Sequence, residues 1–167
     1  MTFPTVAIAN YFIGKAQSEG ICITPMKLLK LVYIAHGWHL GLYDRPLIGE
    51  EVQAWQYGPV VSSVYHDFKH YGSGNITRQH MIPGPDGNPI IPTVTHSKVS
   101  VFLDKVWEAY KHYNGWQLSD ITHQPETPWD IVWRQNGGSE RRGSPIPQQL
   151  IAEYYKKLAT RRDATRT

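Results

Sequence analysis

The chain has 167 residues, of which 41% are hydrophobic. This is enough for one domain with a substantial core and excludes a wholly disordered protein. The formal net charge is only +3, and the excess of Lys and Arg lies in residues 141–167. The charge pattern therefore argues against a sequence-specific DNA reader, although a basic tail at residues 160–167 could touch nucleic acid weakly.

Compartment is indicated by the cysteine content and by the apolar runs. The one cysteine, Cys22, cannot form an internal disulfide, which fits a reducing cytoplasm. No apolar run is long enough to span a membrane. The apolar residues from Val6 to Ile13 lack a preceding basic stretch and a cleavage site of small residues, so we expect a helix there and not a signal peptide. These features predict a cytoplasmic protein.

The first forty residues predict two helices. Apolar residues repeat at helical spacing over 6–16, and Gly20 ends the pattern. Thr24 followed by Pro25 is typical of a helix start, with the threonine as cap and the proline at the first helical position. We expect this second helix to end near Gly41. Because its apolar residues cover more than one face, it is predicted to be the central helix of a bundle.

Residues 52–57 predict a short strand, after which Gly58-Pro59 is expected to break the strand and begin a third helix. One face of that helix is apolar: Val60, Val64, Phe68 and Tyr71. The segment 83–89 is dense in turn formers and predicts a hairpin or a mobile lobe.

The second half of the chain predicts further helices and a loop. The helical segments are expected at 99–113, closed by Asn114-Gly115, and at 118–123, 128–133 and 148–159, with a loop at 137–147. Together the elements predict an α+β fold, a mainly helical compact domain with a small antiparallel sheet or hairpin. We expect residues 1–159 to form a single domain and residues 160–167 to form a flexible tail.

Catalytic signatures are scarce. The chain has no glycine-rich phosphate loop, no G-x-S-x-G elbow and no carboxylate pair suited to acid–base catalysis. His66 and His70 are four residues apart on the predicted third helix, so both could face one metal ion, with Asp67 and His80 as further ligands. This spacing is common by chance, and a solvated polar face is the favoured interpretation. We predict no catalytic residues, no metal and no cofactor, with a metal-dependent enzyme using His66 and His70 as a distant alternative.

Several uncommon sequence words occur in one order along the chain. They are KLLKLVYIAHGW at 27–38, PL at 46–47, AWQYGPVV at 54–61, an L-S-x-x-T-H segment at 118–123 and Pro128-Trp129. In this order the chain resembles the Panacea domain family, formerly DUF4065, which includes SocA-like antitoxins and phage-associated GepA-like proteins. The resemblance implies a compact, mainly helical domain with a small sheet and without catalytic residues.

The resemblance also implies a partner. Panacea domains are antitoxins of bacterial and phage toxin–antitoxin pairs, which neutralise toxins by direct protein contact. The leading hypothesis is therefore an antitoxin that binds its cognate toxin. The alternative is a phage-encoded adaptor or counter-defence protein, which could deliver a partner to a protease such as ClpXP.

The aromatic residues around Gly58-Pro59 and the exposed positions of the third helix are the expected contact surface. The candidate partner-binding residues are Trp55, Tyr57, Pro59, His66, Asp67, Lys69 and His70. The turn-rich segment 83–92 and the basic tail lie outside the motif, and we expect partner choice to vary there.

Overall fold

The computed structural model describes residues 1–165. Its helices are α1 (Thr5–Glu19), α2 (Pro25–Tyr43), α3 (Ser62–Phe68), α4 (Ser97–Tyr110), α5 (Gly115–His123), α6 (Pro128–Asp130) and α7 (Gln148–Thr165), with short 3-10 or π turns η1 (Lys69–Tyr71), η2 (Ile131–Gln135) and η3 (Gly138–Glu140). Its strands are β1 (Val52–Trp55), β2 (Gly58–Val60), β3 (Ile82–Pro83), β4 (Pro89–Ile90) and β5 (Ser144–Ile146). The predicted α+β class, mainly helical with a small antiparallel sheet, is confirmed.

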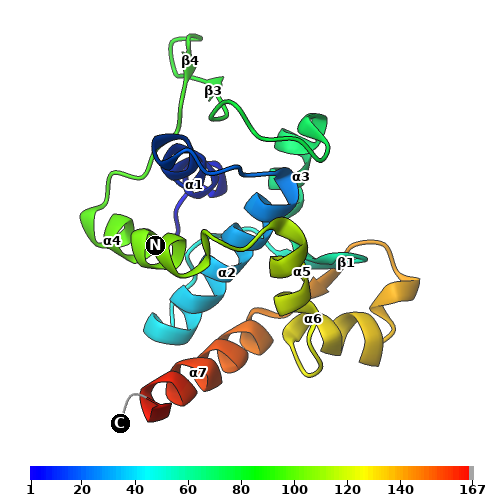
Figure 1. The fold of residues 1–167 in the computed structure, drawn as a ribbon. Helices are drawn as coiled ribbons and strands as arrows, with labels where there is room; N and C mark the ends of the chain where they lie inside the picture. The colour runs from blue at the N-terminus through cyan, green and yellow to red at the C-terminus, as the bar shows by residue number, and fades with distance from the viewer. Residues whose placement is uncertain (166–167) are drawn as a thin grey trace.

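Helix α2 lies at the centre of the molecule, as the sequence predicts (Figure 1). It packs against α1, α4, α5, α7 and strand β2, so nearly every residue up to Leu40 is buried. The hydroxyl of Thr24 accepts the Lys27 N–H at 3.2 Å, and Pro25 occupies the first turn. A helix that is apolar on most faces must be covered on most faces, and the surrounding helices provide that cover.

Two glycines bring α2 and α7 into close contact. A Cβ atom on Gly37 would lie 2.2 Å from the ring of Tyr155, and one on Gly41 would lie 2.7 Å from the Tyr155 backbone. The prediction that the helix ends near Gly41 is wrong. The helix continues to Tyr43, and Gly41 is there because a side chain would push α7 away.

Replacing Gly37 by alanine is expected to lower the free energy of unfolding by about 2 kcal/mol, because the new methyl group meets a buried aromatic ring. Chemical denaturation of purified protein measures this change. Gly14→Ala in α1 is the matched control, since its methyl group would meet only the side-chain nitrogen of Gln79 at 3.2 Å. The close-packing explanation fails if both variants have the stability of the parent.

The three-stranded sheet has the order β2-β1-β5 and is antiparallel throughout. Trp55 pairs with Gly58 across a tight turn, which leaves Gln56 and Tyr57 at the tip. The prediction that Gly58-Pro59 begins a helix is wrong, because both residues belong to β2 and α3 begins at Ser62. A φ of +121° at Gly58 reverses the chain, and Pro59 is tolerated because β2 is an edge strand of this sheet.

Strand β5 lies in the segment for which the sequence predicts only a loop. Val52 pairs with Ile146, and Ala54 pairs with Ser144. The strand is only three residues long and contains a proline, so its local pattern carries no strand signal. Its partner, β1, lies about ninety positions earlier in the chain, and pairing with that strand is what defines β5.

The boundary between α4 and α5 also differs from the prediction. Asn114-Gly115 does not close the preceding helix, which ends at Tyr110. Asn114 instead caps α5: its side chain accepts the Gln117 N–H at 2.9 Å, and the Gln117 side chain accepts the Asn114 N–H at 2.8 Å. This reciprocal pair is a capping box.

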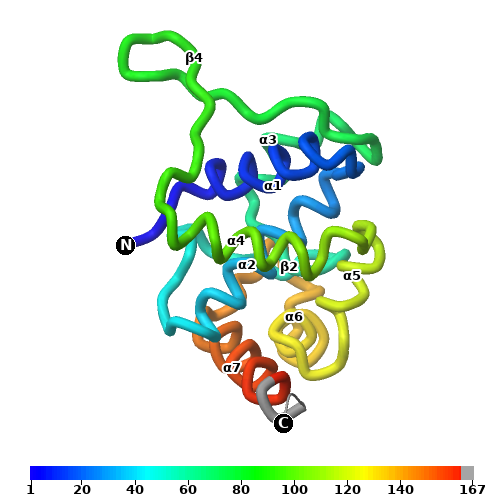
Figure 2. Tube along the Cα trace, turned by 60° about the vertical axis from the view of Figure 1, so that its left-hand side comes forward, coloured from blue at the N-terminus to red at the C-terminus, as the bar shows by residue number. Residues whose placement is uncertain are grey.

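The hairpin β3–β4 stands away from the body of the molecule (Figures 1 and 2). Asn10 of α1 is fully buried. It anchors both ends of the segment that carries the hairpin. The Asn10 amide donates to the carbonyl oxygens of His80 and Pro92 at 3.0 Å each, and its oxygen accepts the His80 N–H at 2.7 Å. The predicted hairpin is confirmed, and its base is fixed by a residue that lies about seventy positions earlier.

Helix α7 extends past Ala159, where the sequence predicts its end, and continues to Thr165. Arg162 lies over the ring of Trp38 with its guanidinium carbon 5.4 Å from the ring centroid, so α2 supports this additional turn. Residues 166–167 of the predicted tail lie outside the described residues. Among residues 1–165, no helix is both long and apolar enough to cross a membrane.

Candidate protein-interaction surface

The turn between β1 and β2 is held in place by side chains of α5 and α6. Three successive carbonyl oxygens of the turn, those of Trp55, Gln56 and Tyr57, each have a side-chain partner. The contacts are Trp129 Nε1 to the Trp55 oxygen at 2.6 Å, His123 Nε2 to the Gln56 oxygen at 3.3 Å, and Ser119 Oγ to the Tyr57 oxygen at 2.7 Å. Because each backbone oxygen is fixed, the tip of the turn has little conformational freedom to lose on binding.

Lys30 of α2 provides a fourth contact, at the start of the strand that follows the turn. Its ammonium nitrogen lies 3.3 Å from the Pro59 carbonyl oxygen, and its side chain is only 1% exposed. Burial lowers the pKa of Lys30 to about 7, because a charged amine is poorly solvated inside the protein. A Cβ atom on Gly58 would lie 2.9 Å from the end of this side chain, which would have to shift to admit it.

These contacts explain two of the sequence words. The residues that hold the turn belong to the L-S-x-x-T-H segment and to the Pro-Trp pair, which follow the turn by about sixty and seventy positions. The sequence predicts a corner at Gly58-Pro59 but gives no indication that Ser119, His123 and Trp129 hold it. The signal in the sequence is that these words occur in one chain in a fixed order. The tertiary contacts between them and the turn are the physical reason.

Two aromatic rings are exposed at the tip of this turn. Tyr57 is 52% exposed and Trp116, at the start of α5, is 62% exposed. Their rings meet edge to face, with centroids 5.8 Å apart. We call Gln56, Tyr57 and Trp116 the aromatic turn surface. Large exposed aromatic rings on a rigid support are the residues that most often dominate the energy of protein–protein contacts.

A second feature, which we call the arginine pocket, lies beside β1 and shares Gln56 with the aromatic turn surface. It has a volume of about 700 Å³ and is lined by residues that include Trp55, Tyr65, His66, Trp133, Arg141 and Arg142. Trp55 and Tyr65 pack edge to face at 4.9 Å. Both arginines are exposed, and within residues 1–165 neither takes part in an ion pair. The pocket therefore combines aromatic walls with two arginines against one carboxylate, Glu140, and this excess of positive charge suits an acidic partner.

The structure separates the predicted contact residues. Trp55 and His66 line the arginine pocket, and Tyr57 forms part of the aromatic turn surface. Pro59 is buried in β2, so its side chain cannot touch a partner. Trp116 is not among the contact residues that the sequence predicts. Its only signal is a tryptophan that lies off the apolar face of a short helix.

The other three predicted residues lie toward or beyond the end of α3. The Asp67 carboxylate lies 3.5 Å from Nε2 of His80, while Lys69 and His70 are exposed in η1. His66 and His70 are both exposed, and over the described range no three His, Cys, Asp or Glu side chains are placed to hold a metal ion together. Asp67 and His80 face each other and do not complete a site with the two histidines.

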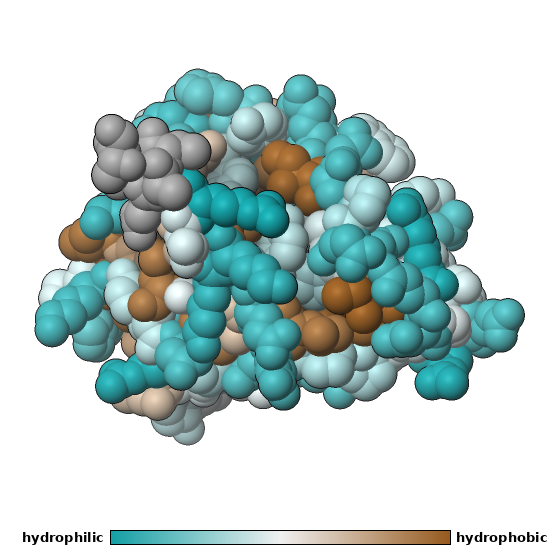
Figure 3. Space-filling view, turned by 90° about the horizontal axis from the view of Figure 1, so that it is seen from below, coloured by the Kyte–Doolittle hydropathy of each residue, from teal (hydrophilic) through white to brown (hydrophobic). Residues whose placement is uncertain are grey.

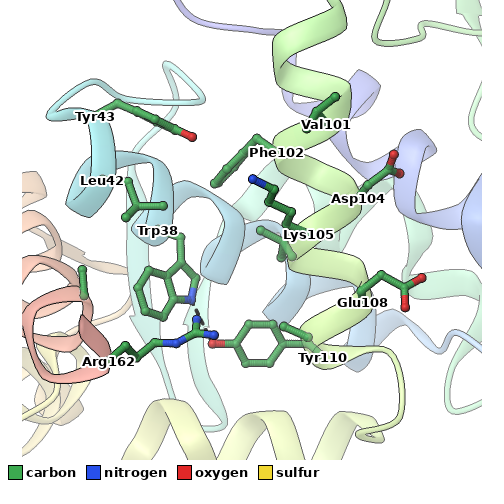
Figure 4. A pocket seen from close by; sticks show the side chains of 13 residues that line it. Trp38, Leu42, Tyr43, Val101, Phe102, Asp104, Lys105, Glu108, Tyr110 and Arg162 are labelled. Atoms are coloured by element: carbon green, nitrogen blue, oxygen red, sulfur yellow. Dashed lines mark hydrogen bonds between the residues drawn. The ribbon is translucent and has the colours of Figure 1, made fainter. Parts of the chain in front are cut away.

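A third feature is a groove between α2, α4 and α7, with a volume of about 610 Å³ (Figure 4). Its apolar lining includes three aliphatic or aromatic side chains that are more than half exposed: Leu42 (51%), Tyr43 (51%) and Val101 (55%). Hydrophobic residues also reach the surface as separate patches among hydrophilic ones when the molecule is seen from below (Figure 3). The sequence does not indicate this groove, because its walls come from three separate helices.

The fold and these surfaces define a small, mainly helical α+β domain with several exposed aromatic contact regions. The chain matches the family described as antitoxin SocA-like, Panacea domain, over residues 28–130, more than half of its length. It therefore belongs to that family, which confirms the resemblance. The matched region runs from α2 to α6 and contains the whole aromatic turn surface and every side chain that holds the turn.

Relatives of this chain include a curated protein. Antitoxin SocA of Caulobacter vibrioides (strain NA1000 / CB15N) is 27% identical over 154 residues, which cover 90% of this chain and 81% of that protein. No solved structure matches the chain significantly.

Proposed function

We propose that the protein is an antitoxin that neutralises a toxin protein by direct contact, and that the aromatic turn surface is the centre of that contact. Membership of the antitoxin SocA-like family supports the antitoxin role. The observation that carries the site is the exposed ring pair of Tyr57 and Trp116 on a turn whose backbone is fixed by four side chains. A rigid aromatic pair contributes apolar contact area at a low entropy cost.

The arginine pocket supports the same proposal. Arg141 and Arg142 lie at its edge without an ion-pair partner among the described residues. Positive charge beside an aromatic anchor increases the rate at which an acidic surface associates, and this effect falls as salt screens the charge. We therefore propose that the toxin presents an acidic region to the arginine pocket.

Co-expression with the product of the adjacent gene tests the proposal. That product is expected to arrest growth when expressed alone, and the protein described here should restore growth and co-purify with it. Absence of both rescue and complex would contradict the antitoxin role. Measuring the amount of the partner distinguishes two mechanisms: direct neutralisation leaves the partner intact in a complex, whereas delivery to a protease such as ClpXP lowers its amount in cells that contain the protease.

A further inference from the structure

The groove between α2, α4 and α7 shares no lining residue with the aromatic turn surface or the arginine pocket, so the proposed contact with a toxin does not account for it. Trp38, Phe102 and Val106 are buried along it, while Leu42 and Val101 stand half exposed at its edges. Apolar side chains that are exposed together along one groove indicate a surface that is covered by a partner.

The shape of the groove suits a helix. The lining residues of α4 run from Val101 to Tyr110, a length of about 15 Å at the rise of an α-helix. Two or three turns of a partner helix would cover this length. The walls are helices, so within the described part of the chain the groove has no strand edge to which an extended peptide could add. Docking of an amphipathic helix along an apolar groove is the mode that such walls allow.

Two acidic and two basic side chains line the groove: Asp104, Glu108, Lys105 and Arg162 (Figure 4). Both carboxylates already have lysine partners, Lys15 and Lys111, that do not line the groove. Asp104 accepts a hydrogen bond from Tyr11 and pairs with Lys15 at 3.3 Å, and Glu108 pairs with Lys111 at 2.9 Å.

Lys105 differs from these two carboxylates. Its side chain points into the groove, and in the part of the chain that the structure describes it has no ion pair. The uncompensated charge that faces an occupant is therefore positive, and a carboxylate on the occupant would complement it.

We propose that this groove binds an amphipathic helix of a partner protein, with its apolar face on Leu42 and Val101 and with a carboxylate opposite Lys105. This docking site is separate from the proposed toxin contact. A second copy of the chain fits less well, because a two-fold contact through the groove would place Lys105 near its symmetry mate while the neighbouring carboxylates remain bound to Lys15 and Lys111.

A pair of labelled helical peptides tests this proposal by fluorescence anisotropy. Both carry leucines at positions i, i+3, i+4 and i+7 and are cross-linked to stay helical. One has glutamates beside the leucines, and the other has lysines. The glutamate peptide is expected to bind about five-fold more tightly, since one partly exposed ion pair contributes up to about 1 kcal/mol.

Two variants of the protein separate the contributions. Val101→Asp is expected to weaken binding of the glutamate peptide by roughly ten-fold or more, because it places a charge on the apolar edge. Lys105→Glu should reverse the preference, so that the lysine peptide binds more tightly. Trp116→Ala should leave both affinities unchanged, which separates this site from the aromatic turn surface. Val101 and Lys105 are exposed, so both variants should fold, and thermal melts check this.

Three results would overturn the proposal. The first is equal binding of the two peptides. The second is lack of saturable binding at concentrations of about 1 mM. The third is a concentration-dependent dimer in sedimentation experiments that Val101→Asp abolishes, which would assign the groove to a second copy of this chain.

Discussion

Replacing Trp116 by alanine is expected to weaken the complex with the toxin by roughly 10- to 100-fold, the effect typical of a tryptophan at the centre of an interface. Trp116 is 62% exposed, and its ring packs edge to face against Tyr57. The free energy of unfolding should therefore change by less than about 0.5 kcal/mol. Titration calorimetry of the purified toxin against each variant measures the affinity, and denaturation measures the stability.

Met81 provides a matched control for this prediction. It is also a large exposed hydrophobic residue, 47% exposed, but it directly precedes β3, at the start of the hairpin and far along the chain from the turn between β1 and β2. Met81→Ala should bind the toxin with the parent affinity. Unchanged affinity in Trp116→Ala would show that the toxin binds elsewhere on the antitoxin, while rescue of growth by the parent protein would still support the antitoxin role.

The second large effect concerns the buried amine of Lys30. Burial lowers its folded-state pKa from 10.5 to about 7, so between these values the unfolded chain holds more protons than the folded chain. Stability must then rise with pH through this window and fall as the pH returns to 7. From pH 7 to pH 9 the free energy of unfolding is expected to rise by about 2 kcal/mol on account of this group.

Lys30→Met should remove this rise, because methionine has a similar length and does not titrate. Lys27, whose pKa burial also lowers, remains in the variant and adds a rise of the same sign. Above about pH 9 the buried tyrosines act in the opposite direction, because burial raises the pKa of Tyr33 and of Tyr155. The measurement is therefore urea denaturation at pH 7, 8 and 9.

Lys98→Met, at an exposed lysine of α4, is the control and should keep the full rise. An identical pH profile in Lys30→Met and the parent would mean that the amine reaches solvent or a counter-charge in solution. The Met variant also loses the contact to the Pro59 oxygen. A change in toxin affinity without a change in the pH profile would therefore assign Lys30 to positioning the turn only.

Part of the candidate site was predictable and part was not. Trp55, Tyr57 and the corner at Gly58-Pro59 come from one short segment, so their proximity is a local property of the sequence. Trp116 reaches the same surface because α5 packs against α2 and β2, and Arg141 reaches the arginine pocket because β5 pairs with β1. These are long-range contacts, and no local pattern of residue types announces them.

Local physical chemistry accounts for what could be read without the structure. The Thr24-Pro25 start, the Gly20 stop and the all-round apolarity of α2 act within one or two helical turns, so α1, α2 and the fold class follow from residue order. The order of the motif words was sufficient for the family. The three-residue β5, the hydrogen bonds that hold the turn and the groove beside α4 arise between segments far apart in the chain. Their free energy comes from pairing and burial that exist only once the chain has folded, which is why they appear only in the folded structure.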